Sequence, residues 1–130
     1  MGGQGGKEII MSAQENRDPL LELCRKLPGV TEDVKWDNDL VFSVGGKMFA
    51  VFALPDLEPF SFKVEPVLFP VLTQRPGIVP APYMAKHSWV SLKSRDVLPR
   101  EELEGLFQES HALVAQKLSK KARAKLGIEE

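Results

Sequence analysis

Two adjacent glycines, Gly45 and Gly46, separate two apolar runs at residues 40–44 and 47–52. In these runs, apolar positions recur with the period of two that is typical of β-strands. A two-residue hairpin turn requires positive φ at both central positions, and glycine adopts such angles without steric cost. The sequence therefore predicts a β-hairpin with Gly45 and Gly46 at its tip.

The glycine loop also predicts a register for the hairpin. Phe42 is expected opposite Phe49, and Leu40 opposite Val51. One face would then carry Leu40, Phe42, Val44, Lys47, Phe49 and Val51, all apolar except the lysine at the tip. Because a slip of one residue would exchange the two faces, burial of this apolar face is expected to hold the register.

The composition is that of an ordinary globular protein. The chain has 130 residues, 43% of them hydrophobic and 27% charged, which suits one compact domain. The glycine-rich start, residues 1–16, is predicted to be a disordered leader, and residues 17–130 a single domain. A net charge of −1 creates no strong overall field that would attract nucleic acid or membranes.

The compartment is predicted from what the sequence lacks. The single cysteine, Cys24, cannot form an internal disulfide, which favours a reducing, cytoplasmic setting. No apolar run approaches the roughly 18 residues of a membrane span, and the start lacks the apolar segment of a signal peptide. We therefore expect a cytoplasmic protein without a membrane partner.

The remaining elements follow from periodicity, caps and breakers. We expect a first helix with Asp18 as its cap, an edge strand over residues 31–36, a strand over 60–64, a helix over 66–74, an irregular connection over 78–86, a strand over 87–93, a long helix from Pro99 and a short helix after Ser119. Strands and helices do not alternate regularly. The predicted fold class is therefore α+β, a two-layer arrangement in which an antiparallel sheet of about five strands carries helices on one face.

Familiar catalytic patterns are missing from the sequence. His87 and His111 lie on different predicted elements, and neither has a cysteine or an acid at metal-ligand spacing. His111 is expected to be a partly exposed residue beside an apolar stripe, and Cys24 a buried, inert thiol. Gly45-Gly46-Lys47 lacks the glycine spacing and the following helix of a phosphate loop. No metal, cofactor or catalytic residue is predicted.

Aromatic and basic residues gather in two places. Residues 80–89 combine a proline-stiffened loop with Tyr83, Lys86, His87 and Trp89. On the sheet face without helices, Trp36, Lys63, Trp89 and Lys93 are candidates to meet. Aromatic rings beside cations can stack on bases or bind anions, but they can equally seal the sheet or form a dimer interface. The basic residues between 117 and 125 suit either phosphate contact or solubility.

Several of these stretches, taken in order, resemble the MmcQ/YjbR family. They are Leu27-Pro28-Gly29-Val30, Trp36, Val41 to Ala50, Phe62-Lys63-Val64, Pro80-Ala81-Pro82-Tyr83 and Lys86-His87-Ser88-Trp89. The resemblance implies a small bacterial, cytosolic α+β domain, related in topology to type III secretion chaperones and distantly to the frataxin-like CyaY fold. It also implies DNA binding through a "double wing" arrangement, and it supplies no settled catalytic residues.

These observations predict a binding module rather than an enzyme. The first hypothesis is DNA binding through basic and aromatic residues. The alternative is a protein-interaction or chaperone-like module that self-associates or holds a peptide on the open sheet face. The candidate binding residues are Lys47, Lys63, Tyr83, Lys86, His87, Trp89 and Lys93.

Overall fold

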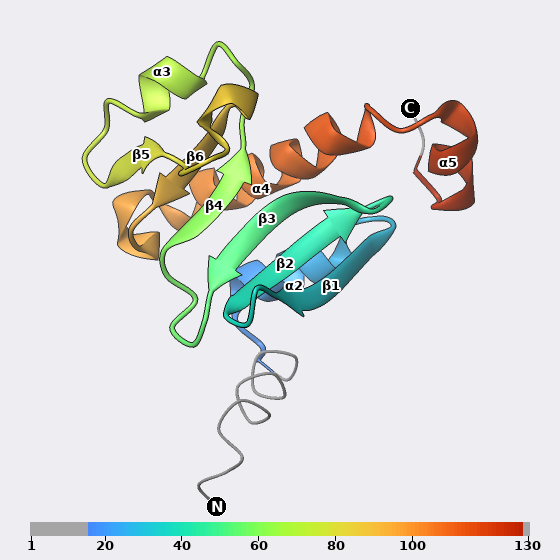
Figure 1. The fold of residues 1–130 in the computed structure, drawn as a ribbon, viewed down its shortest axis with the longest axis horizontal. Coiled ribbons are helices and arrows are strands. Elements are labelled where there is room, and N and C mark those ends of the chain that lie inside the picture. Colours follow the sequence, from blue (N-terminus) through green and yellow to red (C-terminus); the bar gives the residue numbers. More distant parts are fainter. Residues whose placement is uncertain (1–15, 129–130) are drawn as a thin grey trace, which may run out of the picture.

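A computed structural model describes residues 16–128, and its strands form one antiparallel sheet (Figure 1). The strands are β1 (Val30–Lys35), β2 (Asp39–Val44), β3 (Lys47–Ala53), β4 (Phe60–Lys63), β5 (Ile78–Pro80) and β6 (Trp89–Leu92). Their order across the sheet is β1-β2-β3-β4-β6-β5. The antiparallel α+β class is confirmed, with six strands where about five were predicted.

Two helices, α2 (Pro19–Lys26) and α4 (Arg100–Ala115), form the second layer. The shorter helices α3 (Phe69–Leu72) and α5 (Lys120–Lys125) and the 3-10 turns η2 (Ala85–His87) and η3 (Arg95–Val97) lie at the periphery. Figure 1 shows α2 and α4 together behind the sheet. The opposite face, called the open face below, is not covered by these helices. Of the predicted leader, only Asn16 belongs to the described residues.

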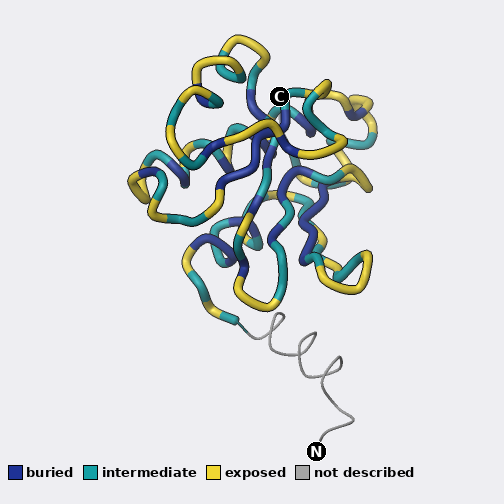
Figure 2. Tube along the Cα trace, turned by 60° about the vertical axis from the view of Figure 1, so that its left-hand side comes forward, coloured by how far each residue is buried: buried dark blue, intermediate teal, exposed yellow. Residues whose placement is uncertain are grey.

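The core lies between the sheet and α4, and phenylalanine dominates it. Six of the seven phenylalanines are almost fully buried, namely Phe42, Phe49, Phe52, Phe60, Phe62 and Phe107. The ring of Phe107, on α4, lies 4.8 Å from that of Phe62 and 5.5 Å from that of Phe52, measured between centroids. Each such burial contributes about 1.5–3 kcal/mol. Figure 2 shows the buried segments at the centre and the exposed loops around them.

The hairpin forms as predicted at its tip, but its predicted register is wrong further along. Gly45 and Gly46 have φ angles of +59° and +82°. Phe42 lies opposite Ala50 rather than Phe49, because Phe49 is an extra residue on β3 at a β-bulge. An extra residue in one strand shifts the pairing of everything beyond it by one position.

The bulge changes which side chains reach the core. Leu40 lies opposite Phe52 rather than Val51, and Phe52 is completely buried. Val51, which was predicted to face the core, instead lies opposite Ser61 on the open face. The bulge therefore gives the core a phenylalanine and the open face a valine.

Three further predictions need correction. The helix predicted over residues 66–74 is confined to Phe69–Leu72, and residues 78–80 pair with β6 as an edge strand. His111, predicted to be partly exposed, is only 6% exposed. Its Nε2–H donates to the carbonyl oxygen of Pro28 at 2.8 Å, and its ring meets that of Phe49 edge to face. A histidine satisfied in this way can be buried at little cost.

Candidate functional site

A groove of about 510 Å³ crosses the open face of the sheet. Its lining comes from the β1–β2 turn, from strands β2, β3, β4 and β6, and from the loop between β5 and η2. The lining residues are Trp36, Asp39, Met48, Val51, Ser61, Ala81, Pro82, Tyr83, Met84 and Trp89. Most of these side chains are apolar or aromatic, which is typical of a ligand-binding concavity.

The sheet register places the middle of the groove. Val51 of β3 pairs with Ser61 of β4, so both side chains point to the open face. On β6, Val90 and Leu92 face the core, which directs Trp89 to the open face. Three adjacent strands, β3, β4 and β6, therefore contribute to the lining, and the ring of Trp89 is only 4% exposed among its neighbours.

Two exposed aromatic residues flank the groove. Trp36, in the β1–β2 turn, is 64% exposed, and Tyr83, in the proline-stiffened loop, is 98% exposed. Both have left-handed backbone angles, with φ of +51° and +66°. Positive φ is uncommon for residues with large side chains, and such strain is found most often at functional sites. Neither aromatic side chain contributes substantially to the core.

Asp39, at the start of β2, is the charged residue of the groove. Burial raises the pKa of its carboxyl, because a partly desolvated carboxylate is disfavoured. Lys35 lies opposite it on β1, but the two side chains form no ion pair. Within residues 16–128, no side chain donates a hydrogen bond to this carboxylate. The groove thus holds a half-buried negative charge without a protein counter-charge.

The predicted binding residues are only partly brought together. Tyr83 and Trp89 line the groove. Lys86 and His87 lie beside it in η2, and the Nζ of Lys63 donates to the carbonyl oxygen of His87 at 2.7 Å. The lysine ammonium is therefore tied to the loop backbone.

The other two predicted residues lie elsewhere. Lys47 is exposed at the hairpin tip, and Lys93 follows β6, where its side chain lies close to Gly77. Neither lines the groove. The seven predicted residues consequently do not form one site.

Lys117 lies near enough to Lys63 for its positive charge to act on it. Partial burial and then the positive charge of Lys117 lower the pKa of Lys63. Like charges raise the free energy of each other's ionised form when they lie close together. An anion bound between these two lysines would relieve that repulsion.

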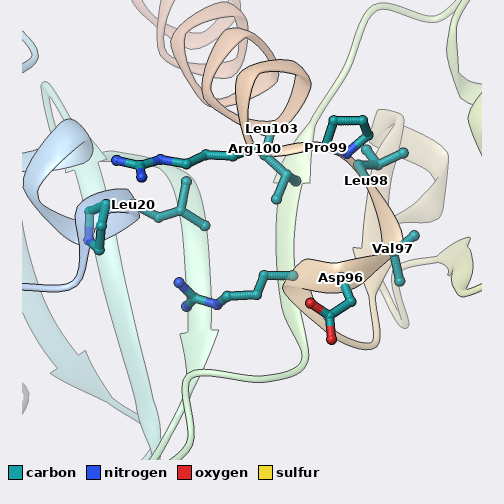
Figure 3. A pocket seen from close by; sticks show the side chains of 9 residues that line it. Leu20, Asp96, Val97, Leu98, Pro99, Arg100 and Leu103 are labelled. Carbon is teal, nitrogen blue, oxygen red and sulfur yellow. The ribbon is translucent and has the colours of Figure 1, made fainter.

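The cavities on other faces have less to offer a ligand. The larger one, about 610 Å³, separates Leu20 of α2 from Leu98 and Leu103 near the start of α4 (Figure 3). Its arginines are already engaged. Arg95 donates to Asp18 at 2.6 Å and Arg100 to Glu104 at 2.9 Å.

A third cavity, about 600 Å³, lies beside His111 and Arg123. The side chain of His111 donates to a backbone carbonyl, as described above, and Arg123 donates to the carbonyl oxygen of Leu118 at 2.7 Å. His111 and Arg123 therefore have partners within the protein, unlike the Asp39 carboxylate in the groove.

Several groove residues, among them Asp39, Met48 and Met84, were not among the predicted binding residues. The alternating pattern of the hairpin placed Asp39 on the mixed face, but it gave no sign that this face would contain a groove. Met48 and Met84 are flexible apolar side chains that suit an adaptable binding surface, but only the folded loop brings them together. A methionine on a strand face gives no signal by itself.

Among residues 16–128, no three histidine, cysteine or acidic side chains gather in a way that could hold a metal ion. No helix of this region is both long and apolar enough to cross a membrane.

Comparisons with known proteins agree on the fold. The family model YjbR matches residues 25–113. The crystal structure of protein DR2400 of Deinococcus radiodurans, described as a DUF419 domain, is similar with a TM-score of 0.76 and 32% identity, over 85% of this chain and 86% of that one. A crystal structure of a Pseudomonas syringae protein shares the fold, with a TM-score of 0.60 and 23% identity over 76% and 98% of the chains. Among curated proteins, no match was found.

Proposed function

This chain belongs to the YjbR family, and we propose that it is a non-enzymatic binding module that holds an extended segment of a partner protein on the open face of its sheet. The observation that carries the proposal is the groove itself. Two exposed aromatic residues with strained backbones, Trp36 and Tyr83, flank an apolar concavity. Exposed aromatic residues around a concave patch are typical of interaction sites.

The composition of the groove supports binding rather than chemistry. Its polar side-chain groups are the carboxylate of Asp39, the hydroxyls of Ser61 and Tyr83, and the indole N–H groups of Trp36 and Trp89. No histidine, lysine or cysteine lines it as a partner for the serine, so a nucleophile–base pair is not formed there. The flexible side chains of Met48 and Met84 can instead adjust to the side chains of a bound segment.

Selection from a random-peptide display library tests this proposal. Peptides enriched on the wild-type protein are expected to be lost on a Trp36→Ala/Tyr83→Ala variant, because both flanking rings are removed. A Val67→Ala/Val71→Ala variant, which alters exposed valines outside the groove, is the matched control and is expected to retain them. Enrichment that is equal on all three proteins would contradict the proposal.

Self-association through the same face is distinguished in the same experiment. Light scattering of the wild type and of the Trp36→Ala/Tyr83→Ala variant reports the mass of each in solution. A monomer in both samples agrees with a groove that is kept for a different protein. A wild-type dimer that the variant loses would make a second copy of this chain the partner.

DNA is a second candidate, favoured by the pair of Lys63 and Lys117. The mutual repulsion of these cations would be relieved by a phosphate. Within this reading, the neighbouring Lys86 and His87 add further contacts. The carboxylate of Asp39 would repel phosphates in the groove itself, so DNA would contact the rim near Lys63 instead.

A mobility-shift titration at low and moderate salt tests DNA binding. Because phosphate contacts release counterions, affinity is expected to fall with salt and to weaken in a Lys63→Gln/Lys117→Gln variant. Lys26→Gln, at the end of α2 behind the sheet, is the control. No shift at about 100 μM protein, the weak end of non-specific affinity, would exclude this candidate.

A further inference from the structure

We infer that the groove on the open face selects a cationic side chain, an arginine or lysine of the bound segment, which lies among the aromatic side chains with Asp39 as its counter-charge. This inference rests on the proposed function and deepens it. It identifies the chemistry of the residue that the groove would recognise.

The negative charge of the groove favours a cation. Asp39 is a carboxylate among lining residues that include no lysine, arginine or histidine. Neither an ion pair nor a hydrogen bond from the described residues neutralises it, although Lys35 is its neighbour across the strands. A partly desolvated carboxylate is more favourable when a cation approaches it. An anionic or phosphate-bearing group would meet repulsion at the same place.

The exposed aromatic residues of the groove also favour a cation. Cations are attracted to the faces of tryptophan and tyrosine rings, and the guanidinium of arginine also stacks on them. Trp36 and Tyr83 are exposed and available for such contact. Trp36 stands three residues before Asp39, the first residue of β2, in the turn that joins β1 to β2. One side chain can therefore approach the carboxylate and an aromatic face together.

The apolar lining suits the long stem of an arginine or lysine side chain. Arginine and lysine have long aliphatic stems that pack on apolar surface while their charged ends stay near water. Met48 and Val51 offer such surface within the groove. A purely aliphatic side chain would use this surface but leave Asp39 without a partner. A short ammonium ion would pair with Asp39 but leave the apolar surface bare.

The probe is an acetylated and amidated peptide, Gly-Leu-Arg-Leu-Gly. Two comparison peptides replace the arginine by citrulline, which is neutral and of similar shape, or by glutamate. Both tryptophans of the chain line the groove, so intrinsic fluorescence reports directly on its occupancy. The arginine peptide is expected to bind about three- to tenfold more tightly than the citrulline peptide, and the glutamate peptide least tightly.

Two conservative variants separate the counter-charge from the general field of the protein. Asp39→Asn is expected to remove the preference for arginine over citrulline. Asp37→Asn loses the same charge in the neighbouring turn, outside the groove, and asparagine tolerates its φ of +71°. This control is expected to keep the preference. Equal loss in both variants would show that the overall field attracts the peptide, and would overturn the inference.

A further variant tests the aromatic contribution. Trp36→Phe keeps an aromatic face and leaves Trp89 as the single reporter, so binding of the arginine peptide is expected to persist. Trp36→Leu keeps apolar surface but loses the ring, and is expected to weaken the arginine peptide more than the citrulline peptide. Equal weakening of both peptides would contradict a contact between the cation and the ring.

Failure of the inference is distinguishable from failure of the proposed function. If the arginine and citrulline peptides bind equally, and both lose affinity in Trp36→Ala/Tyr83→Ala, the groove holds peptides without selecting a cation. The inference then falls and the proposed function stands. If no peptide changes the fluorescence and display selection yields no groove-dependent sequence, both fall.

Discussion

The side-chain hydroxyl of Ser110, on α4, donates a hydrogen bond of 2.7 Å to the carbonyl oxygen of Phe49, the extra residue of the β3 bulge. The same hydroxyl accepts the backbone N–H of Lys63, on β4, at 3.0 Å. Regular pairing between β3 and β4 ends at Ala50 and Phe62, one residue before this point. A helix side chain thus satisfies the backbone groups of the two strands where the bulge separates them.

Replacing Ser110 by alanine should therefore destabilise the protein more than its small size suggests. The variant leaves the Phe49 carbonyl and the Lys63 N–H without their partner in a buried place, at about 1–3 kcal/mol for such a group. Urea unfolding measures the loss. Gln108→Ala, on an exposed position of the same helix, is the control and should change the free energy of unfolding by less than about 0.5 kcal/mol. Equal effects would mean that the bridge does not contribute.

The two hairpin glycines are expected to differ in their tolerance of alanine. Both have positive φ, so either substitution should cost about 1–2 kcal/mol in backbone strain. A Cβ on Gly45 would also lie 2.7 Å from the methyl carbons of Leu118, whereas one on Gly46 would meet nothing within 4 Å. Gly45→Ala should thus be the more destabilising of the two by about 1 kcal/mol or more, as measured by thermal unfolding.

Removing the contact partner checks the cause of that difference. In a Leu118→Ala background, the extra effect of Gly45→Ala over Gly46→Ala should disappear, because the colliding methyl groups are gone. Persistence of the difference would point to the turn itself. It would then follow that the packing of Leu118 against the hairpin tip is not tight.

Cys24 is expected to be inert in the folded protein. It is completely buried on α2, and desolvation raises the pKa of its thiol, so that little reactive thiolate forms. Reaction with a thiol reagent at about pH 8 should be slower in the native protein than in urea by about two orders of magnitude or more. Because Cys24 is the chain's one cysteine, the whole signal belongs to it. Fast reaction without denaturant would contradict its burial.

Asp39 should make stability depend on pH in a defined direction. Burial raises the pKa of Asp39, so the folded protein binds the proton of this carboxyl more tightly than the unfolded chain does, where the pKa of aspartate is about 3.9. The stability contributed by this group therefore falls as pH rises from about 4 through the folded-state pKa, and stays low at neutral pH. Asp39→Asn, which cannot ionise, should gain stability relative to wild type over that interval.

Urea unfolding of both proteins at about pH 4 and about pH 7 measures this difference. The expected result is a larger advantage of Asp39→Asn at the higher pH. A disadvantage at neutral pH would reveal a structural partner for the carboxylate. A groove residue that lowers the stability of the folded protein is expected at a binding site, because residues that contribute only to the fold rarely do so.

Local signals in the sequence predicted much of the fold. Asp18 caps α2 by accepting the N–H of Leu20, and Ser119 caps α5 by accepting that of Ala122. Gly45 and Gly46 form the expected turn. These predictions succeed because caps and tight turns depend on a few neighbouring residues. The predicted register of β3 was wrong because the bulge at Phe49 leaves no recognisable local signal in an apolar run.

The candidate site could be predicted only in part for the same reason. Tyr83 and Trp89 stand out in the sequence as aromatic residues near a stiff loop, and both line the groove. Lys47 and Lys93 were grouped with them by their chemistry, although the fold places them elsewhere. Asp39 was overlooked because an acid at a strand start is ordinary until its surroundings are known.

The sequence by itself determined the α+β class, the caps, the glycine turn and the apolar residues available for a core, because these depend on side-chain chemistry and short-range geometry. Tertiary structure decided which face each β3 residue occupies, since the bulge at Phe49 is accommodated by Ser110 from a helix 61 residues away. It also decided that Trp36, Asp39 and Tyr83 share one groove. Contacts between residues far apart in the chain have no periodic signature, so only the folded sheet brings those three side chains together.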